Sequence, residues 1–155
     1  MEPGKAATLD ARLEEIHLNF DWTIKPELPG FDVDSSMALL KLDGSVHDFV
    51  WWDNKKTNCE CVKFVSADDL HGVQAGTKES IQVQLQKLPD SIFFMVVAVS
   101  VYSKDHNLQH LQDISVSIDT RDKAHLMHYK AMPSSQSAIV SFNLGLGGVE
   151  ANGIA

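Results

Sequence analysis

A period of two in hydrophobicity recurs along this chain and narrows the folds open to it more than any other feature. In residues 16–22 apolar side chains alternate with polar ones, which predicts a strand with one buried face. Residues 81–86 repeat the alternation, with glutamines on the face expected to be wet. Strands of this kind bury their apolar faces by packing one sheet against another.

Further strand segments follow along the chain. Residues 37–42 and 46–52 flank Asp43-Gly44, a dipeptide that is typical of tight hairpin turns. Residues 92–102 are apolar and rich in β-branched side chains, as suits a central strand covered on both faces. We expect this strand to pair with segments at 114–118, 125–132 and 138–144, and we expect one more short strand at 61–65.

Eight or so short strands without a long amphipathic helix predict an all-β fold, a β-sandwich of two mainly antiparallel sheets. Only residues 8–15 suit a helical turn or two. The length of 155 residues is that of one domain. We expect an N-terminal extension at 1–15, the sandwich at 16–144 and a glycine-rich tail at 145–155.

The charge balance limits the partners. With 13 Lys and Arg against 21 Asp and Glu, the net charge of -8 argues against binding of nucleic acid and favours cations. The longest apolar run, residues 92–99, is far shorter than the ~20 residues of a membrane-spanning helix. Residues 1–15 lack the apolar stretch of a secretory signal. We therefore expect a cytoplasmic protein with no membrane span.

Two cysteines, Cys59 and Cys61, lie two residues apart. On an extended chain both side chains share one face, where a mutual disulfide would be badly strained. We therefore expect reduced thiols.

Acidic and amide side chains gather where strands begin or end. Asp32 and Asp34 lie between a Pro-Gly bend and the strand at 37–42. Similar positions are held by Asp53, Asn54, Asp68, Asp69 and Glu79. Calcium takes six to eight oxygen ligands, so loops that meet at one end of a sandwich would form a calcium site. The alternative is a set of solvated acidic turns whose side chains bond their own backbone.

Other chemistry finds less support. The Cys59/Cys61 pair lacks the second pair of a structural zinc site, and His106 and His110 lack the glutamate of a zinc protease motif. The chain has neither a Gly-x-Ser-x-Gly elbow nor a phosphate-binding loop, so we expect no enzyme. Trp51 and Trp52 are adjacent on a strand, which places one ring inward and the other outward beside Asp53.

Taken in order, these segments resemble the TerD-type family, the tellurium-resistance and general stress proteins that bind calcium. Gly30-Phe31-Asp32-Val33-Asp34-Ser35-Ser36 is similar to the family's acidic turn, and Phe20-Asp21-Trp22 to the end of its first strand. The closest match is Asp48-Phe49-Val50-Trp51-Trp52-Asp53-Asn54. The resemblance covers residues 18–144, and its first third is the most specific part.

The resemblance implies a sandwich whose loops hold calcium. Matched residue by residue, it assigns ligand positions to Asp32 and Asp34 and, at the aromatic strand end, to Asp53 and Asn54. The family's long acidic loop falls on residues 67–69 and 76–79 and so includes Asp68, Asp69 and Glu79.

This chain departs from the family pattern at three acidic positions, where it has Gly30, Thr77 and Lys78. Fewer carboxylates and a nearby lysine reduce the attraction for a dication, so we expect one weakened calcium site or none. The chain also has no aromatic residue after Phe142, where the family closes with an aromatic-rich hairpin.

Three interpretations of function follow. The first is a non-enzymatic cytoplasmic stress-response protein of TerD type, of the class linked to tellurite and toxic-anion resistance, that binds calcium weakly. The second is a metal-free scaffold or protein-interaction module that meets a partner or a second copy of itself through an open sheet edge. The third is a small-ligand binder, because some relatives are described as cyclic-nucleotide-binding proteins, although an acidic chain without a phosphate cradle disfavours anionic ligands.

Overall fold

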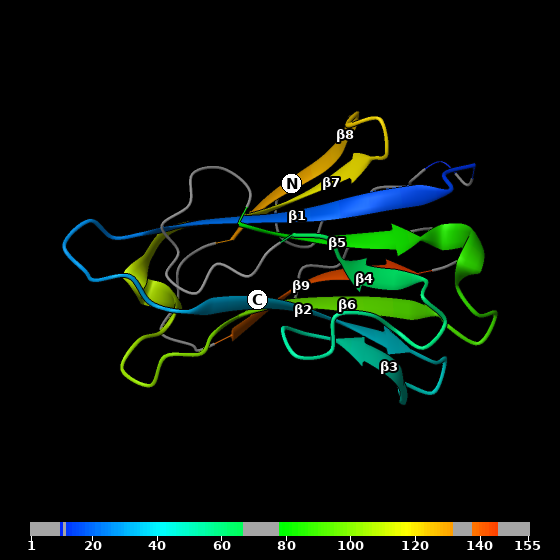
Figure 1. The fold of residues 1–155 in the computed structure, drawn as a ribbon, viewed down its shortest axis with the longest axis horizontal. Coiled ribbons are helices and arrows are strands. Elements are labelled where there is room, and N and C mark those ends of the chain that lie inside the picture. The colour runs from blue at the N-terminus through cyan, green and yellow to red at the C-terminus, as the bar shows by residue number, and fades with distance from the viewer. Residues whose placement is uncertain (1–9, 11, 67–77, 132–137, 146–155) are drawn as a thin grey trace.

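In a computed structural model, this chain folds into two antiparallel sheets stacked in two layers (Figure 1). The structure describes residues 10, 12–66, 78–131 and 138–145. Within them the strands are β1 (Glu15–Ile24), β2 (Val33–Leu40), β3 (Val46–Val50), β4 (Val62–Phe64), β5 (Glu79–Gln84), β6 (Phe94–Val101), β7 (Leu111–Thr120), β8 (His125–Ala131) and β9 (Ala138–Gly145). Two short 3-10 helices, η1 (Leu85–Lys87) and η2 (Leu108–His110), lie between strands.

The five-stranded sheet has the order β4-β5-β1-β7-β8, and the four-stranded sheet has the order β3-β2-β6-β9. Each strand pairing is antiparallel. The predicted all-β sandwich of two antiparallel sheets is therefore confirmed. No helix among the described residues is long and apolar enough to cross a membrane.

The alternation along β1 has the expected physical consequence. Ile16, Leu18, Phe20 and Trp22 are all at most 1% exposed, and the residues between them are only half-buried. Burial of a large apolar side chain contributes ~1.5–3 kcal/mol, so this strand supplies a large part of the core.

The hairpin between β2 and β3 turns at the predicted Asp43-Gly44 pair. Gly44 has a φ of 81°, which a glycine adopts without the penalty that a side chain would bring. The Asp43 carboxylate accepts hydrogen bonds from the backbone N–H (2.9 Å) and the hydroxyl (2.7 Å) of Ser45. The turn is thus held by both a glycine conformation and an aspartate cap.

The predicted pairing of the apolar segment at 92–102 is wrong in two of three strands. β6 lies between β2 and β9, whereas β7 and β8 belong to the other sheet, where β7 pairs with β1. The face of β6 opposite the core is also only half-buried, although we expected both faces to be covered. Long-range pairing depends on which sheet each strand joins, and local hydrophobicity does not encode that choice.

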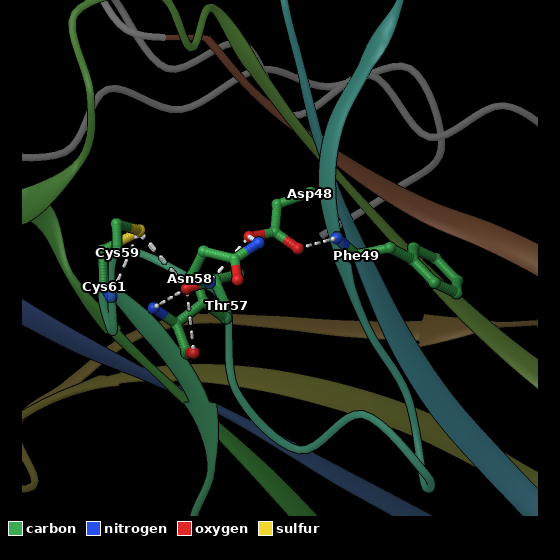
Figure 2. The surroundings of a disulfide bond; sticks show 7 residues. Asp48, Phe49, Thr57, Asn58, Cys59 and Cys61 are labelled. Atoms are coloured by element: carbon green, nitrogen blue, oxygen red, sulfur yellow. Dashed lines mark hydrogen bonds between the residues drawn. A yellow bond between two sulfur atoms is a disulfide. The ribbon is translucent and has the colours of Figure 1, made fainter.

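The expectation of reduced thiols is also wrong, because Cys59 and Cys61 form a disulfide (Figure 2). The two cysteines lie in a turn that precedes β4, and Glu60 between them has a φ of 54°. This turn shortens the Cα–Cα distance to 5.2 Å, within the range of ordinary disulfides. An extended chain would hold these Cα atoms about 6.6 Å apart.

Of the predicted helical turns at 8–15, residues 8, 9 and 11 lie outside the described residues; Arg12 lies in a turn, residues 13 and 14 are not helical, and β1 already begins at Glu15. The tail lies outside them after Gly145, where β9 ends. The limits of the extension, sandwich and tail stay predictions.

Candidate metal site

The first residues of β2 carry acidic and polar side chains into a buried environment. Phe31 and Val33 pack into the core, at 4% and 0% exposure. Asp34 is 7% exposed and Ser35 is 1% exposed, while Asp32 is half-buried. Burial of ionised or polar side chains is costly unless the surrounding groups compensate them, so this end of the strand is chemically distinct from the rest of the sheet.

Glu79 links this end of β2 to the opposite sheet. It is the first residue of β5 and is 2% exposed. Its Oε2 atom accepts hydrogen bonds from the backbone N–H of Ser35 at 2.7 Å and from the Ser35 hydroxyl at 2.5 Å. Because β2 and β5 belong to different sheets, these two bonds connect the layers of the sandwich.

Lys78, immediately before Glu79, is also buried, with 6% exposure. Its backbone N–H donates to the carbonyl of Phe20 at 2.8 Å, which fixes the start of β5 beside β1. A lysine that we expected to weaken the site therefore lies inside the protein at the same end of the sandwich as Glu79.

The backbone around Asp32 is held by the segment that follows β6. The Asp32 carbonyl accepts from the N–H of Tyr102 at 3.1 Å, and its own N–H donates to the Ser103 hydroxyl at 3.2 Å. The Tyr102 ring contacts Trp52 edge-on, with centroids 6.4 Å apart. Through this contact the turn that follows β3, with the exposed Asp53, lies on the same side of the sandwich as Asp32.

Asn54 closes a tight turn after β3. Trp51 and Asn54 exchange backbone hydrogen bonds of 3.1 Å, and the Asn54 side-chain amide donates to the carbonyl of Phe49 at 2.5 Å. Trp52 is 44% exposed, as predicted for one of the two rings. Trp51 is only half-buried and packs on Phe49, with centroids 5.0 Å apart, so the expected inward ring does not reach the core.

The predicted ligands are thus distributed unequally. Asp32, Asp34 and Glu79 lie at the end of the sandwich where β2 and β5 begin, while Asp68 and Asp69 lie outside the described residues. Within the part of the chain that the structure describes, no three His, Cys, Asp or Glu side chains form a group that could hold a metal ion.

The donor chemistry of these residues nevertheless fits a hard cation, since carboxylate oxygens are the ligands that calcium prefers. Two features limit the fit. One oxygen of Glu79 already binds Ser35, and the buried Lys78 carries a competing positive charge. The described residues fit part of a weak site that needs further oxygens.

Sequence reasoning missed three residues that shape this end of the molecule. Ser35 and Ser103 bind Glu79 and the Asp32 backbone, and His106 stacks on Phe31 with centroids 4.4 Å apart and an interplanar angle of 20°. Ser35 lies in the acidic turn ahead of the strand predicted at 37–42, so its place in the core was not predicted. Nothing local marks Ser103 or His106, whose contacts are long-range.

A groove of about 890 Å³ lies at the opposite end of the sandwich, beside the start of β1 and the ends of β5 and β7. It is lined by both signs of charge, including Arg12, Lys87, Arg121, Glu14 and Asp122. Mixed charge of this kind selects no single class of ligand, and none of the predicted metal ligands lines it.

Comparison with known proteins agrees with this architecture. The chain superimposes on the crystal structure of a homologue of the telluride resistance protein TerD from Streptomyces coelicolor A3(2), with a TM-score of 0.75 and 17% identity over 92% of this chain and 90% of that one. It also superimposes on SAV2460, a protein of unknown function, with a TM-score of 0.72 and 16% identity over 86% and 81% of the two chains.

At these identities the two structures establish the fold alone. No curated protein matches the chain significantly. A family model, the TerD domain, matches residues 1–144. The chain therefore belongs to the TerD domain family.

Proposed function

We propose that this chain is a non-enzymatic, cytoplasmic stress-response protein that binds calcium weakly at the end of the sandwich where β2 and β5 begin. Asp32 and Asp34 are the central ligands in this proposal. Asp53, Asn54, Asp68, Asp69 and Glu79 are the further candidates. Family membership supports the general role, and the positions of the carboxylates support the site.

The observation that carries the proposal is the gathering of acidic residues from both sheets at one end of the sandwich. Ser35 binds Glu79 of the opposite sheet, while Asp34, the neighbour of Ser35 in β2, faces the other side of its own sheet. Carboxylates from β2 and β5 are therefore concentrated at one end of a protein whose net charge is -8. Clustered negative charge in a partly desolvated region attracts a dication more strongly than the same charges on an open surface.

The same region explains why binding should be weak. Lys78, which is buried at this end, is a basic residue that reduces the attraction for a calcium ion. Glu79 must also give up or share its bonds to Ser35 before it becomes a full ligand. Few available carboxylates and poor preorganisation place calcium sites near the weak end of the natural range, a Kd of about 0.1–1 mM.

Calorimetric titration of the full chain with CaCl₂ tests this proposal. We expect heat of binding for the wild type and about ten-fold weaker binding for Asp32→Asn, which removes one carboxylate charge and keeps the side-chain shape. Asp122→Asn is the matched control, because it makes the same change in the groove at the other end of the sandwich.

A second readout is thermal stability, since a ligand that binds only the folded state must stabilise it. At ten times Kd the stabilisation is about 1.4 kcal/mol, which raises the melting temperature by about 3–6 °C for a chain of this size. Absence of heat together with an unchanged melting temperature at millimolar calcium would overturn the calcium proposal. Equal losses in Asp32→Asn and Asp122→Asn would overturn its location.

A second candidate function is a metal-free interaction module, which the exposed aromatic pair Trp52 and Tyr102 favours. Their exposures are 44% and 68%, and they lie beside the exposed end of β3, an edge strand. Aromatic side chains of this kind are enriched in binding surfaces. Sedimentation velocity separates the candidates: self-association that Trp52→Ala abolishes supports the module, whereas a clean monomer that binds calcium supports the first function.

A further inference from the structure

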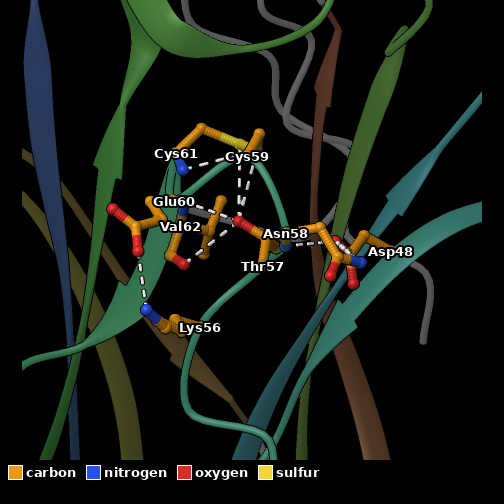
Figure 3. A network of polar contacts seen from close by, with 8 residues as sticks. All are labelled: Asp48, Lys56, Thr57, Asn58, Cys59, Glu60, Cys61 and Val62. Carbon is orange, nitrogen blue, oxygen red and sulfur yellow. Dashed lines mark hydrogen bonds and ion pairs between the residues drawn. A yellow bond between two sulfur atoms is a disulfide. The ribbon is translucent and has the colours of Figure 1, made fainter.

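The turn before β4 holds two sulfur atoms in different environments (Figure 3). Cys61 is 1% exposed, whereas Cys59 is only half-buried. An external reagent therefore reaches the bridge more easily at the Cys59 sulfur. Attack at that atom would make the buried Cys61 sulfur the leaving group.

Hydrogen-bond donors surround the accessible sulfur. The backbone N–H of Cys61 donates to Cys59 Sγ at 3.3 Å, and the Thr57 hydroxyl lies 3.3 Å from Cys59 Sγ and 3.5 Å from Cys61 Sγ. The same hydroxyl lies 3.2 Å from the Val62 carbonyl, so its single hydrogen can turn between that oxygen and a sulfur. These donors stabilise negative charge that develops on either sulfur when the bridge opens.

The turn has supports that do not depend on the disulfide. Asn58 donates from its backbone N–H (2.8 Å) and its side chain (3.2 Å) to Asp48 on β3, as Figure 2 shows. The Thr57 hydroxyl also accepts from the N–H of Val62 at 3.1 Å. A bridge that closes a ring of only three residues removes little chain entropy from the unfolded state, so it is a poor structural staple.

The central residue of the ring favours reopening. Glu60 has a φ of 54°, in the left-handed region that a non-glycine residue adopts at a cost. Its side chain reaches Lys56 at 2.6 Å, an exposed ion pair visible in Figure 3. Opening the bridge lets Glu60 leave the left-handed region, while the bonds of Asn58 and Thr57 still hold the chain.

We propose that Cys59 and Cys61 form a reversible thiol–disulfide exchange site whose co-reactant is a low-molecular-weight thiol. The thiolate of the co-reactant attacks Cys59 Sγ, and a new sulfur–sulfur bond forms there. The bond between Cys59 Sγ and Cys61 Sγ breaks, and its electron pair leaves with Cys61 Sγ as a thiolate, which takes a proton from water.

A second thiolate then attacks the co-reactant's sulfur in the mixed disulfide. This step releases Cys59 as a thiolate, which also takes a proton, and forms the disulfide of the co-reactant. The protein gains two electrons and two protons, and two thiol molecules are oxidised to one disulfide. The reverse sequence closes the bridge again, with the Cys61 thiolate attacking the Cys59 sulfur of the mixed disulfide within the same turn.

The first experiment follows the full chain, oxidised with glutathione disulfide and then incubated with reduced glutathione at neutral pH. Samples are alkylated with iodoacetamide and weighed intact. We expect no alkylation of the oxidised chain and two alkylations after reduction without denaturant. Trypsin should release both cysteines in the peptide between Lys56 and Lys63, in which fragmentation locates the glutathione adduct on Cys59.

Variants test the assigned roles. Cys61→Ser should form a mixed disulfide with glutathione at Cys59. In Cys59→Ser the remaining Cys61 is buried, so it should react with glutathione at least about ten-fold more slowly. Thr57→Val should slow exchange about ten-fold through loss of the hydroxyl donor, and Thr57→Ser, which keeps the hydroxyl, should not.

Three results would overturn the proposal: two free thiols after oxidation, reduction that requires denaturant, or a glutathione adduct on Cys61. If a variant fails to fold, peptide mapping of the wild type still decides between Cys59 and Cys61.

Discussion

Replacing Ser35 with alanine removes the hydroxyl that donates to the buried Glu79 carboxylate across the two sheets. The structure gives this bond a length of 2.5 Å between groups that are 1% and 2% exposed. A hydrogen bond to a charged group contributes about 1.5–3 kcal/mol, and its loss leaves the carboxylate with one donor fewer in a desolvated place. For a chain of this size the melting temperature should fall by about 3–12 °C.

The assay is urea denaturation followed by tryptophan fluorescence, with Ser36→Ala as the matched control. Ser36 is the next residue of β2, points to the opposite face and is half-buried, so its loss should cost about 0.5 kcal/mol or less. A double-mutant cycle with Glu79→Gln isolates the coupling between the two side chains. Equal losses for Ser35→Ala and Ser36→Ala, or no coupling in the cycle, would refute the role of Glu79 as a link between sheets.

Three further predictions concern the turns. The hydrogen bond from the Ser45 hydroxyl is the largest cause that lowers the pKa of Asp43 below its ordinary value of 3.8. The pKa of Asp43 is therefore lower in the folded chain than in the unfolded chain. The ionised carboxylate stabilises the fold above the unfolded-state pKa, and this stabilisation is lost as pH falls through the folded-state pKa. The difference in melting temperature between wild type and Asp43→Asn should accordingly be largest at neutral pH and should disappear in acid. A difference that persists in acid contradicts the assigned role of the Asp43 carboxylate. Gly44→Ala should cost about 1–2 kcal/mol in urea denaturation from the backbone alone, because φ is 81° and no atom lies within 4 Å of the added Cβ; an unchanged midpoint argues against the left-handed turn. The double variant Cys59→Ser/Cys61→Ser should lose at most about 1.6 kcal/mol relative to the oxidised wild type, the loop-entropy value for three residues, and a much larger loss would mark the bridge as structural.

The strands that sequence reasoning placed well are those in which a local period decides the outcome. In β1 each apolar side chain at a spacing of two must face the core, and a shift by one residue would expose all four of its large apolar side chains. Asp43-Gly44 was equally readable because its turn needs a left-handed residue at that position.

The errors concern choices that no local segment contains. The partners of β6 depend on which sheet each later strand joins, and that choice is made by the packing of the whole chain. The Cys59–Cys61 bridge depends on the left-handed conformation of Glu60. A glutamate rarely adopts that conformation, so the sequence does not predict it.

The candidate site was partly predictable for the same reason. The Pro-Gly bend and the apolar run that follows it placed Asp32 and Asp34 near the start of a strand. The strand begins four residues earlier than predicted, at Val33, so Asp34 lies within β2. The bond from Ser35 to Glu79 joins residues 44 positions apart in different sheets, so only the folded chain reveals it. A lysine in an acidic segment is expected at the surface, yet Lys78 is buried, with 6% exposure.

The most direct test of the calcium proposal is a high-resolution crystal structure of the full chain grown with calcium. The proposal predicts one ion with oxygens of Asp32 and Asp34 at about 2.3–2.6 Å, completed by water or by oxygens of the acidic loop residues. Crystals grown at millimolar calcium that show no ion beside these two residues, or an ion bound elsewhere, would contradict it.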